Sequence, residues 1–203
     1  MEECQVEADA LIDFSSAKAT DALLAYCEKR KLPVVLCTTG LSEEQLAKVE
    51  ETSKNVAVLK SANMSLGINL LMKLLKEATK VLAPAGYDME IVEKHHNQKL
   101  DAPSGTAKLL LEAVDPQHRL RPVYGREGNC GRREKDEVGI HALRGGTVAG
   151  THTVHFFGPD EELELTHRAA SRQIFVNGAL HIARLLPGRP KGVYDLQKIL
   201  FGA

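Results

Sequence analysis

Short apolar runs alternate with helical patterns along the first sixty residues. The runs have the length and the β-branched content of buried strands, whereas the segments between them repeat apolar residues at helical spacing. The expected strands cover 10–14, 33–38 and 55–59, and the expected helices cover 17–30 and 42–52. Strict alternation of strand and helix is typical of a parallel sheet with helical crossovers, so this region predicts an α/β unit.

The pattern changes after Lys60. The expected helices there cover 65–82, 104–114 and 174–186, and the expected strands cover 89–92, 138–143, 147–157 and 163–166. Gly145-Gly146 and Gly158-Pro159-Asp160 separate the last three strands and favour hairpins. This region therefore predicts an α+β unit with a mixed or antiparallel sheet. The polar stretch 115–136 is expected to be a surface loop, and 193–200 a tail.

The length of the chain allows it to bury a core without disulfides or metals. Its 203 residues suffice for one large domain or two small ones. The change of pattern near residue 64 favours two domains. We expect residues 1–63 to form the α/β domain together with 174–203, and residues 64–173 to form the α+β domain.

Composition and charge exclude several classes of protein. The hydrophobic share of 43% and the charged share of 26% are typical of globular proteins, which excludes fibrous and disordered chains. A net charge of −1 gives no electrostatic reason to expect nucleic acid. Long apolar runs and a basic-then-apolar leader are both missing, so a cytoplasmic protein without a membrane partner is expected. Four scattered cysteines favour free thiols over disulfides or a metal site.

The segment from Glu93 to Ala107 carries the strongest chemical signal. It ends in Pro-Ser-Gly-Thr, which opens an expected helix. The first backbone N–H groups of a helix are unpaired and carry partial positive charge. Ser104, Gly105 and Thr106 are therefore expected to bind an anion, either a carboxylate or a phosphate.

Two histidines and a lysine precede this turn. Lys99 adds a positive charge, and His95 or His96 can transfer a proton, because imidazole titrates near neutral pH. Each residue alone is compatible with a solvated loop, and Ser104 alone with a simple helix cap. Their presence together within a dozen positions favours a functional site.

The order E-x-H-H-x-x-K-x-D-A-P-S-G-T-A in this segment closely resembles the signature of the bacterial dihydrodipicolinate reductase family, also called 4-hydroxy-tetrahydrodipicolinate reductases. Further segments resemble the family in family order: Ile12–Ser15, Thr38–Gly40, Ala62–Asn69, Tyr124–Gly128 and Thr166–Arg172. The resemblance implies that the α/β domain is a partial Rossmann-like dinucleotide-binding domain. It implies that the α+β domain binds substrate and forms oligomers.

The resemblance also implies an activity and residue roles. The activity is reduction of 4-hydroxy-tetrahydrodipicolinate to tetrahydrodipicolinate by NADPH or NADH, on the diaminopimelate route to lysine, in a cytoplasmic homotetramer. His95 would donate the proton and Lys99 would be a second catalytic group. His96, Ser104, Gly105 and Thr106 would contact the substrate carboxylates. The nicotinamide site would be lined by Cys37, Thr38, Thr39, Ser61, Ala62, Asn63 and Met64.

One feature of the family is missing from this sequence. Family members hold the cofactor pyrophosphate in a Gly-rich turn after the first strand, whereas the first glycine here is Gly40. We therefore expect an incomplete dinucleotide-binding domain that binds NADPH or NADH more weakly than a complete homologue. Either the sequence is incomplete or the homologue is truly shortened. The alternative function is a non-catalytic module for assembly or for dicarboxylate binding.

Overall fold

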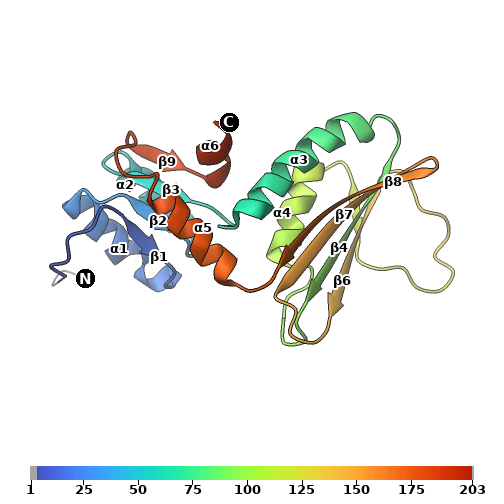
Figure 1. Cartoon of the computed structure of the whole chain (residues 1–203), viewed down its shortest axis with the longest axis horizontal. Helices are drawn as coiled ribbons and strands as arrows, with labels where there is room; N and C mark the ends of the chain where they lie inside the picture. The colour runs from blue at the N-terminus through green and yellow to red at the C-terminus, as the bar shows by residue number, and fades with distance from the viewer. Residues whose placement is uncertain (1–3, 203) are drawn as a thin grey trace. The chain divides into compact units, whose positions relative to one another are not determined.

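The computed structural model describes residues 4–202 and divides the chain into two compact units (Figure 1). The first unit contains the residues up to Leu66 and those from Gln173 onward, and the second contains Gly67–Arg172. Each unit has its own sheet. The first sheet is parallel and the second is mixed, which confirms the expected fold class.

The first unit is a four-stranded parallel sheet in the order β1-β2-β3-β9 with helices on both faces. Its strands are β1 (Leu11–Asp13), β2 (Val34–Leu36), β3 (Ala57–Lys60) and β9 (Gly192–Tyr194). Its helices are α1 (Ala17–Arg30), α2 (Glu43–Ser53), α5 (Gln173–Ala183) and α6 (Leu196–Phe201). The expected strands and helices of residues 10–59 are confirmed, with ends shifted by a few residues.

The central strand β2 is buried on both faces, which explains its continuous apolar run. Val34 and Leu36 pack in one core cluster with Leu24 of α1. Val35, which points to the other face, packs in a second cluster with Ile182 of α5. The C-terminal segment therefore supplies the helices that cover one of the two faces of this sheet. The expectation of a simple tail over 193–200 is wrong, because β9 pairs with β3 and α6 follows it.

The second unit is a five-stranded sheet in the order β5-β6-β4-β7-β8. Its strands are β4 (Asp88–His95), β5 (Arg121–Val123), β6 (Glu137–Arg144), β7 (Gly150–Gly158) and β8 (Glu161–Ala169). The helices α3 (Leu66–Leu82) and α4 (Gly105–Val114) supply Leu75 and Leu110 to the same core cluster as Ile91 of β4. Both helices therefore cover one face of the sheet. Strand β4 is longer than the expected 89–92 and carries Glu93 and His95 within it.

The reversal at Gly145-Gly146 is not the hairpin that the sequence favours. Strand β4 lies between β6 and β7, and it pairs parallel with the first and antiparallel with the second. The connecting loop crosses the end of β4, where the Gly145 N–H donates to the His95 carbonyl at 2.9 Å and the His96 N–H donates to the Val148 carbonyl at 2.8 Å. This crossing fixes the backbone of both histidines.

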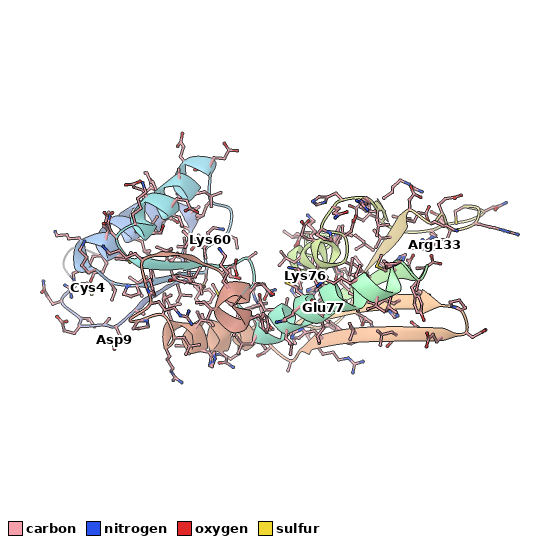
Figure 2. All side chains as sticks on the ribbon, turned by 90° about the horizontal axis from the view of Figure 1, so that it is seen from above. Cys4, Asp9, Lys60, Lys76, Glu77 and Arg133 are labelled. Atoms are coloured by element: carbon pink, nitrogen blue, oxygen red, sulfur yellow. The ribbon has the colours of Figure 1, made fainter. Side chains whose placement is uncertain are left out.

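The polar stretch 115–136 is more ordered than a free surface loop. It contains β5, which pairs with β6. Arg133, labelled in Figure 2, donates from Nη1 to Asp88 at 2.7 Å and from Nε to Glu90 at 3.1 Å. Most of residues 124–136 are exposed, as expected of a surface loop. The expectation missed β5 and the ion pairs that attach the loop to the sheet.

Helix α3 is amphipathic. Leu71 and Leu75 are buried, whereas Lys76 and Glu77 point away from the core (Figure 2). Within residues 4–202, no helix is long and apolar enough to cross a membrane.

Candidate active site

The alternation of side chains along β4 places Glu93 and His95 on the core-facing side, in line with Met89 and Ile91. Glu93 is completely buried, and His95 is 8% exposed. A buried carboxylate is costly unless charged or polar partners surround it, so its contacts identify the organisation of the site.

Glu93 accepts hydrogen bonds from three residues. Arg144 of β6 donates through both Nη atoms, one to each carboxylate oxygen, at 2.7 Å. The Ser104 backbone N–H donates to Oε1 at 3.0 Å, and His95 Nδ1 lies 2.6 Å from Oε2. Burial by itself raises the pKa of Glu93, but the hydrogen bonds from Arg144, His95 and Ser104 outweigh it and hold that pKa below its usual value.

The ionised state of Glu93 defines the tautomer of His95. A carboxylate without a proton only accepts hydrogen bonds, so the ring nitrogen that faces it, Nδ1, must carry a hydrogen. The other ring nitrogen, Nε2, is then the atom that can accept or deliver a proton. Nδ1 of His95 therefore holds the ring in place, and Nε2 is the nitrogen available for proton transfer.

Ser104 begins α4 as its N-cap. Its Oγ accepts from the Ala107 N–H at 3.1 Å and lies 2.9 Å from His152 Nε2. Gly105 and Thr106 occupy the first turn, and a Cβ at Gly105 would meet no described atom within 4 Å. The open side of the turn is therefore beside Gly105. The N–H of Ser104 points elsewhere, because it donates to Glu93.

His152 of β7 supports this cluster from the next strand. It pairs in register with Glu93 on the same face of the sheet and is 4% exposed. Its ring meets that of His95 edge to face, with centroids 5.1 Å apart at 74°. Burial and the neighbouring His95 lower the pKa of His152 to about 4, so it is neutral at pH 7. Its Nδ1 is buried, with no hydrogen-bond partner among the residues described.

Lys99 and His96 lie in the turn between β4 and α4. The Lys99 N–H donates to the His96 carbonyl at 3.2 Å, and its Nζ lies 2.7 Å from Asp101 Oδ1. The lysine lowers the pKa of the Asp101 carboxyl through this hydrogen bond. Because the Asp101 side chain is 60% exposed, the pair is weak and a stronger anion can compete for the ammonium group.

The residues expected at the cofactor lie in the first unit, after the carboxyl ends of β2 and β3. They are Cys37, Thr38, Thr39, Ser61, Ala62, Asn63 and Met64. Thr38 Oγ1 donates to the buried Asp13 at 2.6 Å, which joins the ends of β1 and β2. Ser61 Oγ donates to the Asn63 carbonyl at 3.1 Å, and the Asn63 side chain accepts from the Ser65 N–H at 2.9 Å.

This edge of the sheet fits one part of a dinucleotide. Open α/β sheets bind ligands at the carboxyl ends of their strands. The hydroxyl and amide groups after β2 and β3 offer donors and acceptors of the kind that a nicotinamide carboxamide needs. Burial, aided by Asp13, raises the pKa of Cys37 to about 12, so its thiol is neutral and compatible with a hydride-transfer site.

The roles of Glu93, Arg144 and His152 were not predicted from the sequence. Glu93 and His95 are two positions apart, a spacing that places them on one face of a strand once the strand is extended past Val92. Arg144 and His152 come from other strands, and only the pairing register brings them to Glu93.

His152 and His155, three positions apart on β7, face opposite sides of the sheet. His155 Nδ1 lies 2.6 Å from Glu162 and 3.3 Å from Glu164, on the side away from the helices. Ligand atoms of these three residues lie within 4.8 Å of one another. Their mutual ion pairs account for the arrangement.

Models of a known family match nearly the whole chain. The model described as "Dihydrodipicolinate reductase, N-terminus" matches residues 1–64, and the model described as "Dihydrodipicolinate reductase, C-terminus" matches residues 67–200. Curated relatives of this chain belong to the same family. The 4-hydroxy-tetrahydrodipicolinate reductase of Clostridium tetani is 48% identical over 197 residues, which cover 96% of this chain and 76% of the relative.

A second relative and a solved structure extend the comparison. The 4-hydroxy-tetrahydrodipicolinate reductase of Caldanaerobacter subterraneus subsp. tengcongensis is 50% identical over 203 residues, which cover 98% of this chain and 80% of the relative. The dipicolinate-bound dihydrodipicolinate reductase from Paenisporosarcina sp. TG-14 matches with a TM-score of 0.72 at 27% identity, covering 94% of this chain and 73% of that one. The chain belongs to the dihydrodipicolinate reductase family.

Proposed function

We propose that this protein reduces 4-hydroxy-tetrahydrodipicolinate to tetrahydrodipicolinate with NADH or NADPH, in the diaminopimelate route to lysine. The observation that carries the proposal is a cluster in which the ionised Glu93 joins His95 to the N-terminus of α4, with Lys99 on the turn between them. Such a cluster suits a dicarboxylate, because it offers a proton donor, a positive charge and helix N–H groups within one unit.

Substrate binding is assigned to the turn after β4. The backbone N–H groups at Gly105 and Thr106 and the Lys99 ammonium group attract the carboxylates, and His96 adds a further donor. Ser104 contributes by capping the helix and holding its first turn. The dipicolinate-bound dihydrodipicolinate reductase from Paenisporosarcina sp. TG-14 supports a dicarboxylate of this kind.

The reduction consumes one hydride and one proton and releases the 4-hydroxyl group as water. The reduced nicotinamide supplies the hydride when it is bound. The proton must come from a nearby acid, and Nε2 of His95 is the atom assigned to deliver it, because Glu93 occupies Nδ1. Lys99 is assigned as a second catalytic group that keeps developing negative charge compensated.

Nicotinamide binding is assigned to the loops after β2 and β3. Thr38, Thr39 and Asn63 offer polar groups to the carboxamide, and Cys37, Ser61, Ala62 and Met64 complete the lining. We further propose that the protein works in the cytoplasm as a homotetramer, as the family resemblance implies.

The decisive experiment follows the loss of absorbance of the reduced nicotinamide when the substrate is generated in situ. Turnover with NADH or NADPH, and its competitive inhibition by dipicolinate, is the expected result. A folded chain that binds dipicolinate in calorimetry but oxidises neither cofactor would instead be a dicarboxylate-binding module. Light scattering measures the mass of the assembly and tests the homotetramer.

A further inference from the structure

We propose that Glu93, held by Arg144, is the positioning residue that fixes both the ring of His95 and the start of α4. The inference rests on the proposed function and deepens it, because it concerns how the proton donor is aligned with the substrate-binding turn. Glu93 is completely buried and both of its carboxylate oxygens are bonded to protein groups, so its contribution acts through other residues.

Glu93 contacts the ring of His95 directly. One carboxylate oxygen of Glu93 lies 2.6 Å from Nδ1, within a site where Glu93 is completely buried. A charge-assisted hydrogen bond of this length selects the tautomer with hydrogen on Nδ1 and limits rotation of the ring. Nε2 is thereby kept available for proton transfer, as the orienting carboxylate does in other histidine-dependent sites.

Glu93 also contacts the turn that is assigned to substrate binding. The other oxygen of Glu93 accepts from the Ser104 N–H at 3.0 Å. Arg144 donates from Nη2 to the same oxygen and to the Asp101 carbonyl, at 2.7 and 2.8 Å. One ion pair therefore connects the strand that bears His95 with Asp101 and Ser104 in the turn that precedes α4.

Two further groups restrict the position of the His95 ring. The ring of His152 lies against it edge to face at 5.1 Å. Gly150 passes so near that a Cβ there would lie 3.2 Å from His95 Nε2. With the position of the ring confined in this way, the hydrogen bond to Glu93 is the contact that decides which nitrogen carries the hydrogen.

The chain offers a matched control on the same strand. Glu90 also binds an arginine through both oxygens, with Arg126 at 3.0 Å, and it also contacts a histidine, with His141 Nε2 at 2.9 Å. Glu90 points to the opposite face of the sheet, away from His95. A comparison of Glu93→Gln with Glu90→Gln therefore separates the position of the carboxylate from the loss of a paired charge.

The experiment uses the full chain and two measurements. In Glu93→Gln, kcat is expected to fall about 10–100-fold with little change in KM, the usual scale for loss of a residue that orients a histidine. In ¹⁵N NMR of the histidine rings, neutral His95 is expected to carry hydrogen on Nδ1 in the wild type and to lose that preference in Glu93→Gln. Glu90→Gln is expected to leave both measurements unchanged, and Glu93→Asp to restore part of the tautomer preference.

Two results overturn the inference. One is a wild-type His95 with hydrogen on Nε2, and the other is a Glu93→Gln variant that loses activity without a change of tautomer. If Glu93→Gln does not fold, the double variant Glu93→Gln/Arg144→Gln removes both charges and is measured in its place, and the wild-type tautomer still decides. If the wild type has no reductase activity, the proposed function fails, whereas the NMR comparison continues to test the positioning role.

Discussion

His95 is buried, with Glu93 at Nδ1 and the ring of His152 against its own ring. Its replacement gives the most direct test at the scale of one residue. His95→Gln removes the proton donor but keeps a polar side chain of similar size. We expect kcat to fall about 10²–10⁴-fold with little change in KM, as is usual for loss of a general acid. Lys99→Ala should impair both constants, because it removes a charge as well as a donor.

His118→Gln is the control, since the His118 side chain is 74% exposed and contacts only the surface carboxylate of Glu112 among the partners described. Steady-state kinetics of the three variants, with circular dichroism to verify the fold, provide the measurement. Near-full turnover by His95→Gln would transfer the role of proton donor to His96, Lys99 or water.

His152 predicts how stability depends on pH. Its pKa is about 4 in the folded state, below the ordinary 6.5, because burial disfavours the charged ring. Between these values the unfolded chain binds a proton that the folded chain does not, so the free energy of unfolding must fall as the pH falls from 6.5 to 4. The loss is on the order of 3 kcal/mol if the full shift is realised.

Urea unfolding at a series of pH values measures this dependence. In His152→Gln, the free energy of unfolding should depend less on pH between pH 6.5 and 4.5. This range lies above the pH at which the ion-paired carboxylates of Glu90 and Glu93 gain protons in the folded state. Some dependence of the free energy of unfolding on pH should remain, because burial also lowers the pKa of His167. An unchanged slope in His152→Gln would show that His152 titrates alike in both states.

At the scale of elements, Gly178 shows how closely α5 packs in the first unit. A Cβ at this position would lie 1.7 Å from the carbonyl oxygen of Met64, a backbone atom that cannot move aside as a side chain can. Alanine usually stabilises a helix relative to glycine, but here the clash dominates. We expect Gly178→Ala to lower the free energy of unfolding by about 1–3 kcal/mol.

Gly145→Ala is the matched control, because a Cβ there would meet no atom within 4 Å in the described part of the chain. Urea unfolding of both variants gives the comparison. A stability of Gly178→Ala equal to that of the wild type would mean that α5 shifts without cost.

Elements with local signals were predictable from the sequence. Ser42 and Gln45 form the capping box that starts α2, and α1 has the predicted bounds. The strands β5 and β9 were missed, because their sequences, Arg-Pro-Val and Gly-Val-Tyr, lack the apolar run that marks the equally short β1 and β2. The order of the mixed sheet was also missed, since Gly145-Gly146 signals a reversal but not which strand lies next to which.

Some residues of the candidate site also have a local signal in the sequence, and others do not. His95, His96, Lys99 and the turn 104–106 share one contiguous segment, so their composition and spacing indicated chemistry. Arg144 and His152 are far from Glu93 in the sequence and reach it through strand pairing alone. Pairing between distant segments depends on the packing of the whole unit rather than on a local pattern.

At the scale of the whole molecule, the two units should respond separately to a local perturbation. Each has its own sheet and its own core clusters. In Gly178→Ala, we expect faster amide hydrogen exchange in β1, β2, β3 and β9 and unchanged exchange in β4, β6 and β7. Exchange that accelerates equally in both sheets would instead indicate one cooperative unit.

The position of β9 at the edge of the first sheet has a consequence for synthesis on the ribosome. The second unit, Gly67–Arg172, is one continuous stretch and can fold as soon as it has left the exit tunnel. The first unit must wait with β1, β2 and β3 already made, because α5 and β9 are translated after the whole of the second unit. During that interval the face of the early strands that α5 later covers is exposed, and it is there that a chaperone would bind the nascent chain.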